Sequence, residues 1–215
     1  MLAKTSHALS RTVILRSLQF DDITMRTTVF STPLITPLLR LIAILLLKLT
    51  GRKAVGEEID TPKYVLIGAP HTSNWDFPLM LLVVLKLRLQ VFWMGKHTLF
   101  SFPVGWLMKW LGGIPIDRNR SHNVVNEIVI QFKQEEELVV LIPPEGTRRK
   151  VSEWKTGFYH IAHNAEVPIL MGYVDAAKKE AGIADYFHPS GELEADMKEI
   201  RAFYANKKGI RAENS

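Results

Sequence analysis

From residue 63 onward, short apolar runs alternate with longer amphipathic segments. A short apolar run that ends at proline or glycine is typical of a buried strand, and a longer run with helical spacing is typical of a helix packed on a sheet. We predict strands over 64–69, 90–94, 138–142 and 168–174, with 178–184 pairing with the last as a hairpin. We predict helices over 75–89, 121–136, 157–165 and a charged, solvent-facing 191–206, with two short ones within 97–111. Strands that alternate with helices predict an α/β fold, in which helices flank a mostly parallel sheet.

The first 32 residues show neither pattern. Serine and threonine are frequent there, and the first 20 residues carry basic side chains but no acidic one. We therefore predict a poorly ordered N-terminal tail over 1–32 and one domain over 33–215. A transit peptide has a similar composition, and Met25 is an alternative start, so whether residues 1–24 belong to the native protein stays open.

The most apolar stretch of the chain is 33–51. A helix over 37–50 would be about 21 Å long, at about 1.5 Å per residue, whereas the hydrocarbon core of a bilayer is about 30 Å thick. This helix is therefore too short to span a membrane. Two alternatives stay open: an apolar helix lying in the membrane interface, with Arg40 and Lys48 reaching toward the head groups, and a helix buried in the protein core.

Composition limits the class of chain and the kinds of site that the sequence can form. Apolar residues make up 47% of the 215 and charged residues 23%, which is ordinary for a globular domain and excludes a disordered or fibrous chain. Cysteine is absent, which excludes disulfides, thiolate metal sites and a cysteine nucleophile. The net charge of +5, from 27 basic and 22 acidic side chains, favours a partner that carries phosphate: nucleic acid, anionic lipid or a phosphorylated metabolite.

Two polar segments directly follow predicted strands. HTSNWD (71–76) follows the strand 64–69, and PEGTRRK (144–150) follows the strand 138–142. Ligands of open α/β sheets bind outside the carboxyl ends of the strands. If the two strands are parallel neighbours, both segments therefore lie at one site.

His71 and Asp76 suit general base catalysis. A carboxylate can hold one imidazole nitrogen as N–H and leave the other to take a proton from a hydroxyl. The spacing brings the two together only with His71 in a loop and Asp76 in the first helical turn, with Ser73 or Asn74 as N-cap. The alternative is that Asp76 only complements the helix N-terminus and that His71 is an ordinary loop histidine.

The PEGTRRK segment suits phosphate binding. Gly146 lets a backbone N–H approach a ligand, and Arg148 and Arg149 suit bidentate recognition of phosphate. Arg118, which follows the glycine pair 112–113, adds a further guanidinium. The alternative for each is a solvated basic turn.

Four sequence blocks occur in a fixed order. They are HTSNWD, GGIPIDR, PPEGTRR and VPI, at 71–76, 112–118, 143–149 and 167–169. In this order and spacing they resemble the glycerolipid acyltransferase family, whose best-known members are bacterial 1-acylglycerol-3-phosphate acyltransferases. The similarity covers about residues 60–175, includes GKHTLF at 95–100, and leaves the tail and the last helix outside.

The resemblance implies an acyltransferase of phospholipid biosynthesis, which moves a fatty acyl group from acyl-CoA or acyl carrier protein to a hydroxyl of a lysophospholipid or glycerol-phosphate-type acceptor. His71 would be the base, and Asp76 would orient it. The acceptor and its phosphate would be held by Lys96, Arg118, Glu145, Gly146, Thr147 and Arg148. In this family the acceptor attacks the thioester directly, which agrees with the absence of cysteine and of a G-x-S-x-G serine motif. We expect a backbone N–H near Gly146 to stabilise the oxyanion.

The chain departs from the family pattern at three places. The N-terminal pair of membrane helices is reduced to 33–51, Pro143 stands where phenylalanine is common, and Arg149-Lys150 replaces the usual serine. The last two lie where the acceptor is recognised. An aminolipid or nonphosphorylated lysolipid acceptor is therefore an alternative, and so is an inactive lipid-binding protein.

The expected partners are an acyl donor thioester, a lysolipid acceptor and a membrane surface. The chain would be peripheral or monotopic on the cytoplasmic face of that membrane. Nucleic acid is not expected, because the basic residues form no long stripe. No metal and no cofactor is expected, since the acyl donor is a substrate. The aromatic residues of 97–111 could line an acyl tunnel, rest on the bilayer or pack in the core.

Overall fold

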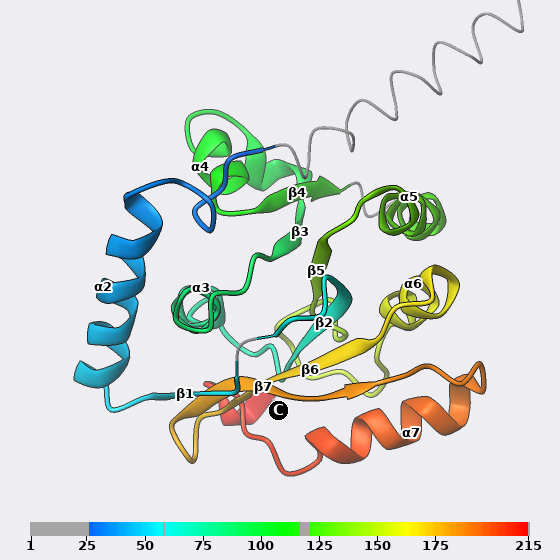
Figure 1. The fold of residues 1–215 in the computed structure, drawn as a ribbon. Coiled ribbons are helices and arrows are strands. Elements are labelled where there is room, and N and C mark those ends of the chain that lie inside the picture. The colour runs from blue at the N-terminus through cyan, green and yellow to red at the C-terminus, as the bar shows by residue number, and fades with distance from the viewer. Residues whose placement is uncertain (1–25, 58, 117–120, 215) are drawn as a thin grey trace, which may run out of the picture.

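The structure of the chain is a computed structural model that describes residues 26–57, 59–116 and 121–214. The strands are β1 (Lys53–Val55), β2 (Lys63–Ala69), β3 (Phe92–Lys96), β4 (Gly113–Ile116), β5 (Leu138–Ile142), β6 (Ile169–Asp175) and β7 (Glu180–Phe187). Within the described residues they form one seven-stranded sheet in the order β1-β7-β6-β2-β5-β3-β4 (Figure 1).

The sheet is mostly parallel. β2 lies at its centre and pairs in parallel with β5 on one side and with β6 on the other. β7 runs antiparallel to β6, and β1 follows the direction of β7. The predicted α/β fold is therefore confirmed, and so is the hairpin at its end.

Helices cover both faces of the sheet (Figure 1). α3 (Asp76–Lys86) lies on one face, and α2 (Ile35–Leu49) packs outside α3. The other face carries α5 (Ser121–Gln134), α6 (Gly157–Ala165) and α7 (Leu193–Tyr204). The short helices η1 (His97–Phe100) and α4 (Gly105–Trp110) connect β3 to β4, and η3 (Ala212–Asn214) lies near the end of the chain.

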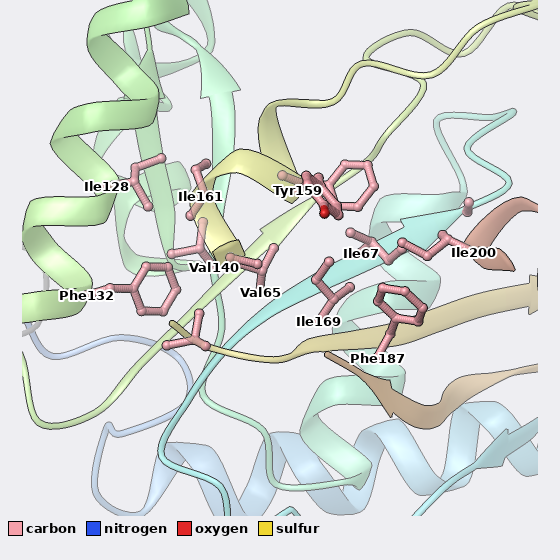
Figure 2. Close-up of a cluster of buried hydrophobic side chains, with 14 of the residues drawn as sticks. Val65, Ile67, Ile128, Phe132, Val140, Tyr159, Ile161, Ile169, Phe187 and Ile200 are labelled. Carbon is pink, nitrogen blue, oxygen red and sulfur yellow. The ribbon is translucent and has the colours of Figure 1, made fainter. Parts of the chain in front are cut away.

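Side chains of β2 point alternately to the two faces of the sheet, and a hydrophobic core lies on each face. Val65 and Ile67 face α5, α6 and α7, in the cluster drawn in Figure 2 with Phe132, Tyr159 and Ile200. Tyr64 and Leu66 face the other way, toward α3 and α2. Because successive strand side chains point to opposite faces, one central strand anchors both helical layers.

The main differences from the sequence prediction are short or amphipathic elements. β1 and β4, only three and four residues long, were not predicted. The last helix is not simply solvent-facing, since Met197, Ile200 and Tyr204 are buried against the sheet. Charged and apolar side chains are interspersed along this helix, so its apolar stripe is not apparent from the sequence.

Part of the predicted tail lies outside the described residues, and part is packed. Residues 1–25 are not described. Of the rest, Val29 and Phe30 are buried, and the Val29 N–H donates to the carbonyl oxygen of Trp110. The tail prediction is therefore wrong for the residues around Val29, because their apolar side chains belong to the buried cluster against which Trp110 also packs.

α2 keeps most of its apolar side chains on the surface. Ala43 and Leu47 are buried, whereas Leu38, Leu41 and Leu45 are more than half exposed. A helix buried in the core is therefore excluded for 35–49. None of the helices described in 26–57, 59–116 and 121–214 is long and apolar enough to cross a membrane.

Candidate active site

The two polar segments meet, because β2 and β5 are parallel neighbours with Ile67 opposite Ile142. His71 follows the first strand, and Glu145 follows the second. The His71 backbone N–H donates to both oxygens of the Glu145 carboxylate, at 3.1 and 3.0 Å. The expected convergence at the carboxyl edge of the sheet is confirmed.

His71 and Asp76 form a pair. The imidazole Nδ1 lies 3.0 Å from the Asp76 Oδ2, with the imidazole about a quarter exposed and the carboxylate buried. The same Oδ2 accepts the backbone N–H groups of Thr72 and Ser73, at 2.7 and 2.8 Å. His71 is in the loop and Asp76 in the first turn of α3, as the spacing predicts.

The predicted N-cap is wrong. α3 begins at Asp76, and Trp75 in the cap position makes no side-chain capping bond. Ser73 instead accepts the Trp75 N–H through its hydroxyl oxygen, at 3.2 Å. The Asp76 carboxylate folds back and accepts the N–H groups of Thr72 and Ser73, which precede the helix.

This arrangement has the features of a general base. Because Nδ1 faces the carboxylate, Nε2 is the ring nitrogen left for a substrate hydroxyl. The second carboxylate oxygen, Oδ1 of Asp76, is buried and has no hydrogen-bond partner within the described part of the chain. Buried polar atoms are rarely left without a partner, and a functional site is one setting that explains such an exception.

Glu145 lies beside this pair. Burial raises the pKa of Glu145 to about 7, although the hydrogen bond from the His71 N–H and the His71 charge oppose the shift. The nearby Asp76 carboxylate adds to the rise. The carboxyl group of Glu145 therefore titrates near neutral pH while it holds the His71 backbone.

A cavity of about 520 Å³ opens at His71. Its lining includes most of the predicted site residues: His71, Asp76, Lys96, Gly146, Thr147 and Arg148. Glu145 is not in the lining, because its carboxylate is turned to the His71 loop. Arg118 lies outside the described residues. No group of His, Asp or Glu able to hold a metal ion occurs in the part of the chain that the structure describes.

The inner part of the cavity is apolar and runs beneath α3. Met80, Val83 and Val84 line it from the helix, and Leu66 and Ile183 line it from the sheet. Asp76 and Val84 are eight residues apart, so the cavity follows about 12 Å of the helix at about 1.5 Å per residue.

Comparison with known proteins identifies the family. A family model described as Acyltransferase matches residues 48–171, more than half of the chain. The chain belongs to the acyltransferase family. The match contains the His71 loop, β5 and the PEGTR segment, and it ends before β7 and α7.

Individual relatives agree with this assignment. The chain is 31% identical over 107 residues to the 1-acyl-sn-glycerol-3-phosphate acyltransferase of Haemophilus influenzae, covering 46% of this chain and 43% of that protein. It is 28% identical over 145 residues to the probable 1-acyl-sn-glycerol-3-phosphate acyltransferase of Mycoplasma pneumoniae, covering 54% and 49%. The chain thus spans about half the length of the curated relatives it matches.

A solved structure shares the fold. The crystal structure of the 1-acyl-sn-glycerophosphate acyltransferase of Thermotoga maritima matches with a TM-score of 0.55 and 18% identity. The match covers 81% of this chain and 82% of that chain, so the likeness extends over most of the acyltransferase domain.

Gly146 occupies a tight turn of this acyltransferase. Its φ of +64° is in the left-handed region that favours glycine. Its N–H donates to the Pro143 carbonyl oxygen at 3.1 Å and thereby closes the turn. This N–H therefore serves the turn, and the expectation that a backbone N–H near Gly146 stabilises the oxyanion stays a prediction.

Two residues beside the acyltransferase site were not predicted from the sequence. The Lys155 side chain lies beside Gly146, with its Nζ 3.6 Å from where a Cβ would stand. Burial raises the pKa of Tyr204, and the neighbouring Glu145 carboxylate adds to it. Tyr204 is far from the motifs in sequence, Lys155 follows the PEGTRRK segment by five residues, and no local pattern marks either of them.

The aromatic side chains of 97–111 do not line the cavity, so the acyl-tunnel alternative is not supported for them, and contact with a bilayer stays a prediction. Leu99 and Met108 line the cavity. Phe100 stacks on Trp93, while Phe102 and Trp106 are 96% and 70% exposed.

Proposed function

We propose that the chain transfers a fatty acyl group from a thioester to a hydroxyl of a lysophospholipid or glycerol-phosphate-type acceptor. The observation that carries this proposal is the His71–Asp76 pair at the mouth of an apolar cavity. Cations stand beside that mouth, since Lys96 and Arg148 line the same cavity. The base suits the acceptor hydroxyl, the apolar channel suits the acyl chain, and the cations suit the phosphate.

The proposed chemistry is a single displacement. Nε2 of His71 accepts the proton of the acceptor hydroxyl as its oxygen attacks the thioester carbonyl carbon. The carbon–sulfur bond of the resulting tetrahedral species then breaks, and the imidazolium returns its proton to the thiolate that leaves. Asp76 holds the ring at Nδ1 and stabilises the positive charge that forms on it.

The two substrates would enter different parts of the cavity. The acyl chain suits the apolar space beneath α3, where burial contributes about 0.8 kcal/mol per methylene. The acceptor phosphate suits Arg148 and Lys96, with Thr147 beside them and Arg118 as a further predicted contact. Acyl donors of either kind, acyl-CoA or acylated carrier protein, present the same thioester to His71.

We also propose that the chain works at the surface of a membrane, on its cytoplasmic face. The exposed leucines of α2 form an apolar strip, and Phe102 and Trp106 are exposed on the segment before β4. Tryptophan, leucine and flanking cations are typical of segments that lie in a membrane interface. Flotation with vesicles containing anionic lipid tests this, and a chain that stays wholly in the aqueous fraction contradicts it.

The activity is tested by following free thiol release with a panel of acceptors. Acyl-CoA and acyl carrier protein serve as donors; lysophosphatidate, glycerol 3-phosphate, an aminolipid and a nonphosphorylated lysolipid serve as acceptors. We expect a phosphorylated acceptor to give the largest increase. If only the aminolipid or the nonphosphorylated lysolipid responds, the acceptor class is different, and if none raises thiol release, the proposed transfer is wrong.

A further inference from the structure

The residues that follow α7 contact the loop that carries His71. We call residues 205–214 the C-terminal segment. The Arg211 backbone N–H donates to the Thr72 hydroxyl oxygen at 3.1 Å. The Asn214 side-chain amide donates to the Thr72 carbonyl oxygen at 3.4 Å. Both bonds join residues more than 130 positions apart in the sequence, and the family match at 48–171 does not include the segment.

The C-terminal segment is itself fixed to the sheet. Its Lys208 carbonyl oxygen accepts the Ala176 N–H at 2.7 Å, directly after β6. The Lys207 Nζ lies 4.3 Å from the centre of the Tyr173 ring, and Tyr173 lines the cavity. Ile210 packs against the core on the α3 side of the sheet. Several contacts therefore hold the C-terminal segment at the same edge of the sheet as the site.

Thr72 links this segment to the catalytic pair. It is 1% exposed and follows His71 directly. Its N–H donates to the Asp76 Oδ2 at 2.7 Å, the same oxygen that contacts the His71 Nδ1. The main chain of Thr72 is thus held by Asp76 on one side and by the C-terminal segment on the other.

We propose that the C-terminal segment is a positioning element of the active site, which fixes the His71 loop against Asp76 by holding Thr72. This rests on the proposed function, since the geometry that it maintains is the one that activates the acceptor hydroxyl. Displacement of a catalytic group by about 1 Å can cost roughly a hundredfold in rate. Thr72, Asn214 and the Arg211 main chain are therefore positioning groups, although none of them touches substrate.

The test compares variants that remove one bond each. Thr72→Val keeps the shape of the side chain and removes the hydroxyl that accepts the Arg211 N–H, and Thr72→Ser keeps the hydroxyl. Asn214→Ala removes the second bond. Asn206→Ala is the matched control, because Asn206 is exposed in the same segment and does not contact Thr72. Each is assayed for kcat, for KM of donor and acceptor, and for thermal unfolding.

We expect Thr72→Val to lower kcat roughly 10- to 100-fold, and Asn214→Ala by somewhat less, with KM values within about twofold of wild type. Thr72→Ser should restore most of the rate. In a His71→Ala background, where the base is gone, Asn214→Ala should change the residual rate by no more than about twofold. If the two bonds served stability alone, the variants would lower the fraction of protein that is folded and leave the kcat of that fraction unchanged.

Hydrogen exchange of the peptide that contains residues 71–76 gives a readout that needs no turnover. Asn214→Ala should speed its exchange, and Asn206→Ala should not. The proposal is overturned if kcat of folded Thr72→Val and Asn214→Ala equals that of wild type, whether or not exchange changes. A wild-type chain that is inactive on every acceptor overturns the proposed function and the positioning role with it, whereas an active chain with unaffected variants overturns the positioning role alone.

Discussion

Gly68 is the position where a side chain would close the apolar cavity without disturbing the fold. It lies in β2 between Ile67 and Ala69, in register with Gly172 of β6, and it lines the cavity. An ideal Cβ at this position meets no atom within 4 Å. Glycine inside a strand is less stable than alanine by roughly 0.5–1 kcal/mol. Gly68→Ala and Gly68→Leu should therefore keep or raise the unfolding temperature.

The size of the effect follows from the volume that each side chain takes from the acyl chain. A leucine adds four carbon atoms and displaces about four methylenes, each worth roughly 0.8 kcal/mol of burial. The loss is about 3 kcal/mol, or roughly a hundredfold or more in kcat/KM for a long-chain donor. An alanine displaces about one methylene, so we expect a loss of about fourfold. A donor too short to reach Gly68 should lose little.

The assay measures thiol release with donors of increasing chain length, together with thermal unfolding of each variant. Gly157→Ala is the control, since a Cβ there meets only the Val125 side chain at 3.8 Å and Gly157 does not line the cavity. The reasoning is refuted if folded Gly68→Leu uses long-chain donors as well as wild type does. Equal loss on every donor would also refute it, because the leucine would then act on the reacting centre and not on the chain.

Three further predictions concern charge and surface. The pKa of Glu145 is raised from 4.5 to about 7, so the stabilising contribution of this carboxyl group is full below about pH 4.5 and is lost as pH rises through 7. Glu145→Gln should therefore raise the unfolding free energy by up to about 3 kcal/mol at pH 8 and by much less at pH 5, as thermal melts would show. Arg148→Ala should raise KM for a phosphorylated acceptor roughly 10- to 100-fold through loss of a charge-assisted bond, while the adjacent Arg149→Ala, outside the cavity lining, should not. Leu41→Glu on α2 should weaken binding to vesicles about tenfold or more, whereas Ile130→Glu, similarly exposed on α5, should leave flotation unchanged. Equal dependence of unfolding on pH in wild type and Glu145→Gln would contradict the role given to Glu145. Equal rises in KM for Arg148→Ala and Arg149→Ala would contradict the phosphate contact, and equal losses of vesicle binding for Leu41→Glu and Ile130→Glu would contradict the membrane contact of α2.

The sequence was sufficient for the parts of the fold that local pattern determines. The strand 138–142 and the helix 157–165 have the predicted bounds, because an apolar run between Glu137 and Pro143 defines the first and a clear helical stripe defines the second. β1 and β4 were not predictable in this way, because three or four residues are too few to show alternation. Their pairing with β7 and β3 stabilises them.

The site was predictable where motif and topology coincide. His71 and Asp76 belong to one short motif, in the loop after β2 and the first turn of α3, and the parallel pairing of β2 and β5 brings the PEGTR segment to them. The contact between Glu145 and the His71 N–H could not be predicted, because it depends on which way one carboxylate turns. The contact of Arg211 with Thr72 uses a main-chain N–H, which any residue except proline could supply, so no sequence pattern marks it.

The central claim is that His71, held by Asp76, activates an acceptor hydroxyl for direct attack on a thioester. The most direct measurement is the rate of acceptor-dependent thiol release by wild type and by His71→Ala, with acylated acceptor quantified in the same reactions. The account predicts that wild type releases one thiol per acylated acceptor, without a burst when acceptor is absent. It also predicts that His71→Ala leaves only a small residual rate of this release, while its unfolding temperature stays close to that of wild type. Equal rates of acceptor-dependent release in wild type and folded His71→Ala would contradict it.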